Sequence, residues 1–128
     1  MADFTGIYGE LRALLLRAAA GMSVTEDRPG QITLSAAWPN PYRPKERMFF
    51  GMAKASKAYA SLHLMPVYTH PALLNGLSPQ LKRRMQGKSC FNFTAADPVL
   101  LAEIEALTRR CAQTYAAPWS ASAKAGDA

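Results

Sequence analysis

Apolar residues recur every three or four positions in two long segments, one near each end of the chain. The N-terminal stripe consists of Phe4, Ile7, Tyr8, Leu11, Leu14, Leu15 and Ala18, and the C-terminal stripe of Leu100, Leu101, Ile104, Leu107, Cys111 and Tyr115. This spacing places the apolar side chains on one face of an α-helix. Asp3 and Asp97 are suitable N-caps, and Gly21 ends the first pattern as glycine does after a helix. The sequence therefore predicts two amphipathic helices.

Between these helices the pattern changes to the alternation of β-strands. Apolar and polar residues alternate along 31–38, after a turn at 28–30 that joins this strand to an earlier one at 22–26. Further strands are predicted at 48–54, 59–67 and 88–93. The three prolines in residues 39–44 donate no hydrogen bond and exclude both a helix and a central strand, so we expect an ordered, partly extended loop there. Short helices are expected at 70–76 and, after the cap at Ser78, at 79–85.

Tight turns between successive strands imply antiparallel pairing. The predicted fold class is therefore α+β: a two-layer sandwich in which an antiparallel sheet of about five strands carries the N- and C-terminal helices on one face. Residues 1–117 are expected to form this single domain. Residues 118–128 are rich in alanine and serine and cannot build a core, so we expect a flexible tail.

The composition of the chain fits this prediction. At 128 residues and 49% hydrophobic residues, it can bury a core without disulfides. Its two cysteines, Cys90 and Cys111, lack the close spacing of a metal site and indicate a reducing compartment. No segment approaches the roughly 20 apolar residues of a membrane span, and the first residues do not resemble a signal peptide. We therefore expect a cytoplasmic protein.

The net charge of +6 is concentrated in the middle of the chain. Residues 43–88 contain nine basic side chains and a single acidic one, Glu46, whereas the rest of the chain has six basic and eight acidic side chains. An anionic partner would meet this middle region. The simpler interpretation is a solvated basic surface that maintains solubility.

One stretch of the sequence carries a family resemblance. A strand containing His63 is followed by the segment Gly87-Lys88-Ser89-Cys90-Phe91-Asn92-Phe93 and by a helix after Asp97-Pro98. Residues 57–110 thereby resemble a superfamily of small bacterial proteins of unknown function, some of them described as iron-chaperone-like or bacillus-frataxin-like. The resemblance implies a two-layer α+β fold and transmits no function. We do not expect iron handling, because binding a hard cation calls for clustered carboxylates and the middle of this chain has one acid.

Polar side chains of two predicted strands are the candidate ligand-binding residues. By the period-two rule, Tyr59, Ser61 and His63 share one face of their strand, and Cys90 and Asn92 share one face of another. If the two strands are neighbours, these side chains converge on a pocket, with Lys88 as a basic residue at its rim. The alternative is that this is the ordinary solvent face of the sheet.

A second candidate is a basic cluster that could bind an anion. Lys82, Arg83 and Arg84 follow the helix start at Ser78, and this combination could hold phosphate. Nucleic acid is not expected, because no recognisable motif is present and Phe91 and Phe93 alternate as core residues. His63 and His70 have no third ligand, so we expect no metal site.

We therefore expect a non-enzymatic binding or interaction module, without a cofactor, for a small polar or anionic ligand or a protein partner. Two alternatives stay open. The protein could be a small enzyme in which His63 acts with Cys90 or Tyr59, since a thiol beside a base forms a nucleophile. It could also be a homodimeric structural protein whose exposed sheet face is the subunit interface. A membrane partner is not expected.

Overall fold

The computed structural model describes residues 5–118 and has the predicted α+β architecture. The predicted tail at 118–128 lies, apart from residue 118, outside the described residues. One antiparallel sheet has the strand order β1-β2-β3-β4-β6-β5. Its strands are β1 (Ser23–Arg28), β2 (Gln31–Asn40), β3 (Arg43–Ala55), β4 (Ala60–Leu64), β5 (Met85–Gln86) and β6 (Cys90–Phe93). The helices are α1 (Thr5–Ala18), α2 (Met65–Thr69), the 3-10 helix η1 (Pro71–Leu74), α3 (Pro79–Lys82) and α4 (Pro98–Thr114).

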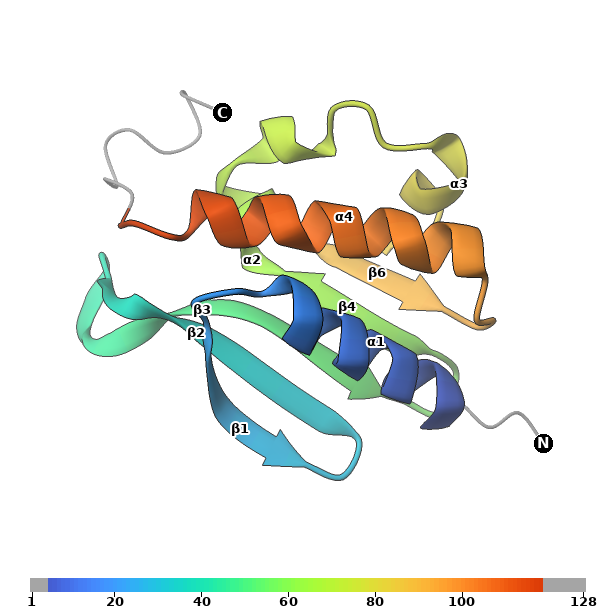
Figure 1. Cartoon of the computed structure of the whole chain (residues 1–128), viewed down its shortest axis with the longest axis horizontal. Coiled ribbons are helices and arrows are strands. Elements are labelled where there is room, and N and C mark those ends of the chain that lie inside the picture. The colour runs from blue at the N-terminus through green and yellow to red at the C-terminus, as the bar shows by residue number, and fades with distance from the viewer. Residues whose placement is uncertain (1–4, 119–128) are drawn as a thin grey trace.

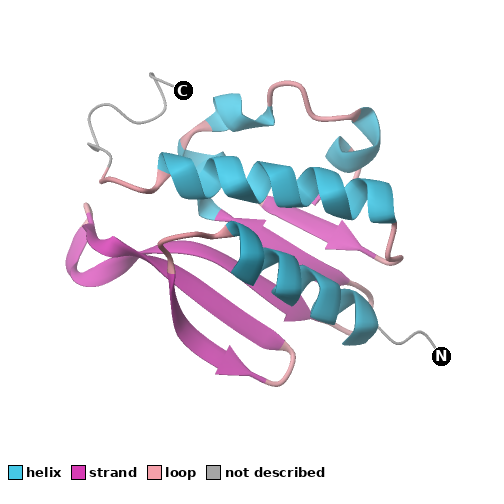
Figure 2. Cartoon of the chain, in the orientation of Figure 1, coloured by secondary structure: helices cyan, strands magenta, loops and turns pink. Residues whose placement is uncertain are grey.

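The two long helices, α1 and α4, lie side by side on the same face of the sheet (Figures 1 and 2). Their apolar stripes meet the inward-facing side chains of the strands, and Leu11, Ile104, Phe50 and Phe91 have no solvent exposure. Most of the described residues of both predicted stripes are therefore in the core, and Leu100 and Leu101 are half-buried at its edge. Phe4 and the predicted cap Asp3 lie outside the described residues. The alternate side chains of β4 and β6 point to the opposite face and are only half-buried. None of the helices within residues 5–118 is long and apolar enough to cross a membrane.

The predicted loop at residues 39–44 is wrong, because β2 and β3 continue through it as a two-stranded ribbon. Pro39 pairs with Arg47, and Asn40 pairs with Arg43, so only two residues remain for the turn. The last β1 pairing is between Ser23 and Ser35, so β2 has only one neighbour beyond that point. Proline is tolerated on such an edge because its missing N–H faces no partner strand.

Two other predicted boundaries are also wrong. The strand predicted at 59–67 pairs only as far as Leu64, and the chain then turns into α2 with Pro66 in its first turn. The helix predicted at 79–85 ends at Lys82. Met85 and Gln86 instead form β5, a strand that the sequence did not predict and that pairs with β6 at the edge of the sheet. Gly87, at a φ of 72°, begins the turn that makes this pairing possible.

Candidate functional site

The strands that carry the predicted ligand-binding residues are neighbours in the sheet. β4 pairs with β6 so that His63 lies opposite Cys90 and Ser61 lies opposite Asn92. Directly opposite residues point to the same face, so the convergence predicted from sequence is present. On the other side of β4, Ser61 lies opposite Lys54 of β3. A continuous row of polar side chains therefore crosses three strands.

This row borders a hollow of about 270 Å³ on the sheet face opposite the long helices, termed here the open-face hollow. It is lined by Lys54, Ser56, Tyr59, Ser61, Gln86, Cys90 and Asn92. Four of the six residues predicted for a ligand site line it. His63 and Lys88 do not line it. His63 lies two residues beyond Ser61 on the same face of β4, and Lys88 is exposed in the turn between β5 and β6.

Sequence reasoning missed Lys54, Ser56 and Gln86. The first two could have been found, because folding the predicted strands 48–54 and 59–67 about the turn at 56–57 places Lys54 beside the polar face of β4. Gln86 could not have been found, because it was placed in the turn between a predicted helix and the final strand. Both Lys54 and Gln86 are exposed.

The open-face hollow carries one positive charge and no negative one. The Lys54 ammonium forms no ion pair within residues 5–118, and no lining residue is acidic. Asn92 donates from Nδ2 to Oε1 of Gln86 over 2.6 Å, which fixes the orientation of both amides. One N–H of Asn92 Nδ2 is thereby used. The second N–H of that group, the Oδ1 atom of Asn92 and the Nε2 group of Gln86 keep their hydrogen-bonding capacity.

His63 is half-buried beside the hollow. Its Nε2 atom is buried without a hydrogen-bond partner in the described part of the chain, and its ring packs edge-on against Phe49 at a centroid distance of 5.1 Å. Burial lowers the pKa of His63 because it disfavours the imidazolium form. Burial likewise raises the pKa of the Cys90 thiol. Both shifts favour a neutral imidazole and a neutral thiol, which is not the ionised pair that an activated cysteine requires.

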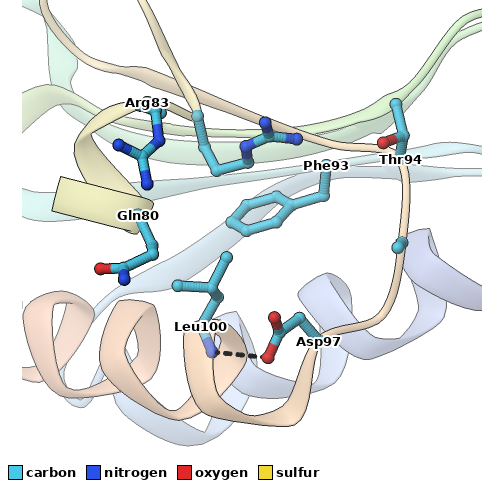
Figure 3. A pocket seen from close by; sticks show the side chains of 8 residues that line it. Gln80, Arg83, Phe93, Thr94, Asp97 and Leu100 are labelled. Carbon is cyan, nitrogen blue, oxygen red and sulfur yellow. Dashed lines mark hydrogen bonds between the residues drawn. The ribbon is translucent and has the colours of Figure 1, made fainter. Parts of the chain in front are cut away.

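The start of α3 at Ser78, which the sequence indicated as part of an anion site, is occupied by a glutamate of α4. The amide and hydroxyl of Ser78 both donate to the Glu103 carboxylate, over 2.7 and 2.6 Å. That end of α3 therefore already holds an anion supplied by the chain itself. A phosphate at Ser78 stays a prediction, and it would have to compete with Glu103 for these two donors. Arg83 and Arg84 line a separate hollow near the start of α4 (Figure 3). Lys82 is exposed and lines neither this hollow nor the open-face hollow.

No group of three or more histidine, cysteine, aspartate or glutamate side chains within residues 5–118 is placed to hold a metal ion. Both cysteines are free thiols. Cys111 is fully buried and packs in the core as a small apolar side chain of α4, and this burial raises the pKa of its thiol to about 12.

Comparisons with known proteins give no further assignment. No protein-family model, no curated protein and no solved structure matches the chain. The resemblance of residues 57–110 to the iron-chaperone-like superfamily therefore stays a prediction, and the site has to be interpreted from its own chemistry.

Proposed function

We propose that this protein is a non-enzymatic binding module that holds a small polar or anionic ligand in the open-face hollow. The observation that carries the proposal is the unpaired ammonium of Lys54 within a ring of uncharged hydrogen-bonding side chains. A carboxylate or similar anion of metabolite size would supply the missing charge.

The lining residues offer complementary contacts to such a ligand. Lys54 provides the charge-assisted hydrogen bond, which is about twice as strong as a neutral one. Ser61 and Tyr59 contribute hydroxyl groups, and Gln86 contributes an amide N–H. Because Asn92 already fixes the Gln86 side chain, less conformational entropy is lost when that amide binds a ligand.

Catalysis by His63 with Cys90 has less support. Nucleophilic catalysis needs a thiolate and a base held by a third group. Burial shifts both pKa values toward the neutral forms, and no side chain in residues 5–118 hydrogen-bonds to the buried Nε2 atom of His63. A binding role needs neither ionised form.

The proposal can be tested by native mass spectrometry of freshly purified, untagged protein. We expect a co-purifying small molecule that is lost in Lys54→Ala and kept in Lys57→Ala, an exposed lysine in the neighbouring turn that does not line the hollow. If the protein is isolated empty, backbone NMR titrations with succinate and with inorganic phosphate replace the first readout. Retention of the ligand by Lys54→Ala, or no titration shifts at β4 and β6, would contradict the proposal.

A homodimer through the same face is the second candidate. Phe49 and Met52 of β3 are only half-buried, and Met52 lies directly opposite His63. A second copy would cover these apolar side chains. In the same mass spectra, a dimer that dissociates in Met52→Lys would support this candidate, and a monomer at micromolar concentration would argue against it.

A further inference from the structure

A second hollow, termed here the arginine hollow, lies between α3, the end of β6 and the first turn of α4 (Figure 3). Its volume is about 290 Å³, close to the lower limit of roughly 300 Å³ for ligand pockets, so only a small ligand would fit. It is lined by Gln80, Arg83, Arg84, Phe93, Thr94, Ala95, Asp97 and Leu100. None of these residues lines the open-face hollow.

The walls of the arginine hollow are fixed by contacts that do not involve a ligand. Leu81 is fully buried and anchors α3 to the core, and Ser78 ties the start of α3 to Glu103 of α4. The carbonyl of Arg84 accepts a hydrogen bond from the amide of Asn92 over 2.8 Å, which holds this backbone against β6. The hollow is therefore largely preformed, so ordering its walls adds little to the free-energy cost of binding.

Most polar side chains around the hollow have no partner among the described residues. Neither guanidinium forms an ion pair, and the side chains of Gln80 and Thr94 form no hydrogen bond, among residues 5–118. Asp97 uses Oδ1 to accept hydrogen bonds from the amides of Val99 and Leu100, which leaves its Oδ2 atom unused. The start of α4 is thus already capped, and any ligand would be held by side chains.

Opposite charges stand on opposite walls of this hollow. Figure 3 shows Arg83 and Gln80 on the α3 side and Asp97 on the α4 side, with the Phe93 ring and Leu100 between them. A simple anion bound to the arginines would face the Asp97 carboxylate. A ligand that carries an ammonium group as well as a carboxylate would complement both walls.

We propose that the arginine hollow binds a small zwitterion, namely a free amino acid with an apolar side chain. Its carboxylate lies against Arg83 and Arg84, and its ammonium group lies against Oδ2 of Asp97. Its side chain packs toward Leu100, which is half-exposed beside the Phe93 ring. This site is independent of the ligand proposed for the open-face hollow.

The test is an NMR titration of the full chain with L-leucine, following the backbone amides of residues 80–84 and 94–100. N-acetyl-leucine, which lacks the ammonium group, and leucinamide, which lacks the carboxylate, are the matched probes. Because each probe removes one charge-assisted contact, we expect each to bind about tenfold more weakly than leucine. No shifts with about 10 mM leucine would overturn the proposal.

Three variants connect the binding to the named side chains. Arg84→Gln is expected to weaken leucine binding about tenfold, whereas Arg47→Gln, an exposed arginine on the β2–β3 ribbon, leaves it unchanged. Asp97→Asn keeps an N-capping side chain for α4 and removes the negative charge, so leucine should lose its advantage over N-acetyl-leucine. Equal binding of these two molecules to the unmodified protein, or tighter binding of inorganic phosphate, would show a plain anion site and refute the zwitterion.

A further control separates this proposal from the function proposed above. Lys54→Ala removes the charge of the open-face hollow and should leave leucine binding unchanged. If Lys54→Ala abolishes the leucine-induced shifts while Arg84→Gln does not, leucine occupies the open-face hollow and the arginine hollow proposal fails. The two proposals can therefore fail separately.

Discussion

Gly51 allows β3 and β4 to approach each other, and its replacement by alanine should destabilise the fold. Gly51 lies opposite Leu64 in the sheet and is buried beneath α1. A Cβ atom built there would lie 2.8 Å from the backbone carbonyl oxygen of His63 and 3.4 Å from Cδ2 of Leu64. The nearest atom belongs to the backbone of a paired strand, so it cannot move aside as a flexible side chain could.

The size of the effect follows from this distance. Carbon and oxygen atoms in sheets approach to about 3.3 Å, so the new methyl group would need about 0.5 Å more space. Overpacking of this kind costs about 1–3 kcal/mol. The reduced conformational entropy of the unfolded chain offsets about 0.4–1 kcal/mol of that cost. We therefore expect Gly51→Ala to lower the free energy of unfolding by about 1–2 kcal/mol.

Urea denaturation followed by circular dichroism measures this loss as a lower midpoint with an unchanged slope. Gly9→Ala is the matched control, because Gly9 is an exposed helical residue of α1, and the added Cβ would have no atom within 4 Å apart from its chain neighbours and the backbone of its own helix. That variant should gain about 0.5–1 kcal/mol from helix propensity. If Gly51→Ala is as stable as the unmodified protein, the close approach of β3 and β4 described here is wrong.

Two further predictions concern Glu103 and His63. Glu103→Ala leaves the amide and hydroxyl of Ser78 without their acceptor and should lower the free energy of unfolding by about 1–3 kcal/mol, whereas Glu103→Gln, which keeps an acceptor, should lose less in the same urea assay. Equal losses would count against this hydrogen-bond pair. Because burial lowers the pKa of His63, the unfolded chain binds a proton below about pH 6.5 that the folded chain does not, so stability falls as the pH falls toward the lowered pKa. His63→Gln should flatten the stability profile between about pH 7 and 5.5, and an unchanged slope would contradict the burial of this ring.

The helices and the buried face of the sheet could be predicted from the sequence because their signals are local. The apolar stripe of α4 and the alternation along β2 follow from residues a few positions apart. The caps at Ser78 and Asp97 are local as well, and both side chains accept the expected backbone hydrogen bonds. These features depend on the local backbone geometry and on residues within the same segment, and not on contacts with other segments.

The candidate sites could be predicted only in part. The period-two rule placed Ser61 with His63, and Cys90 with Asn92, on common faces, but could not establish that β4 and β6 are neighbours. The acceptor at Ser78 is a glutamate 25 residues away, which no local pattern indicates. The arginine hollow likewise joins α3 to the start of α4, although the two strands β5 and β6 lie between these helices in the chain.

The ribbon at residues 39–44 shows most clearly the difference between what the local sequence predicts and what strand pairing decides. Its prolines correctly exclude a helix and a central strand, yet whether they exclude every strand depends on how far β1 extends beside β2. The sequence by itself determined the two amphipathic helices, the alternating strands and the faces of their side chains, because covalent geometry and local spacing set them. Tertiary structure alone decided which strands pair, where an edge begins and which polar groups stay unpaired, because these depend on contacts between segments far apart in the chain.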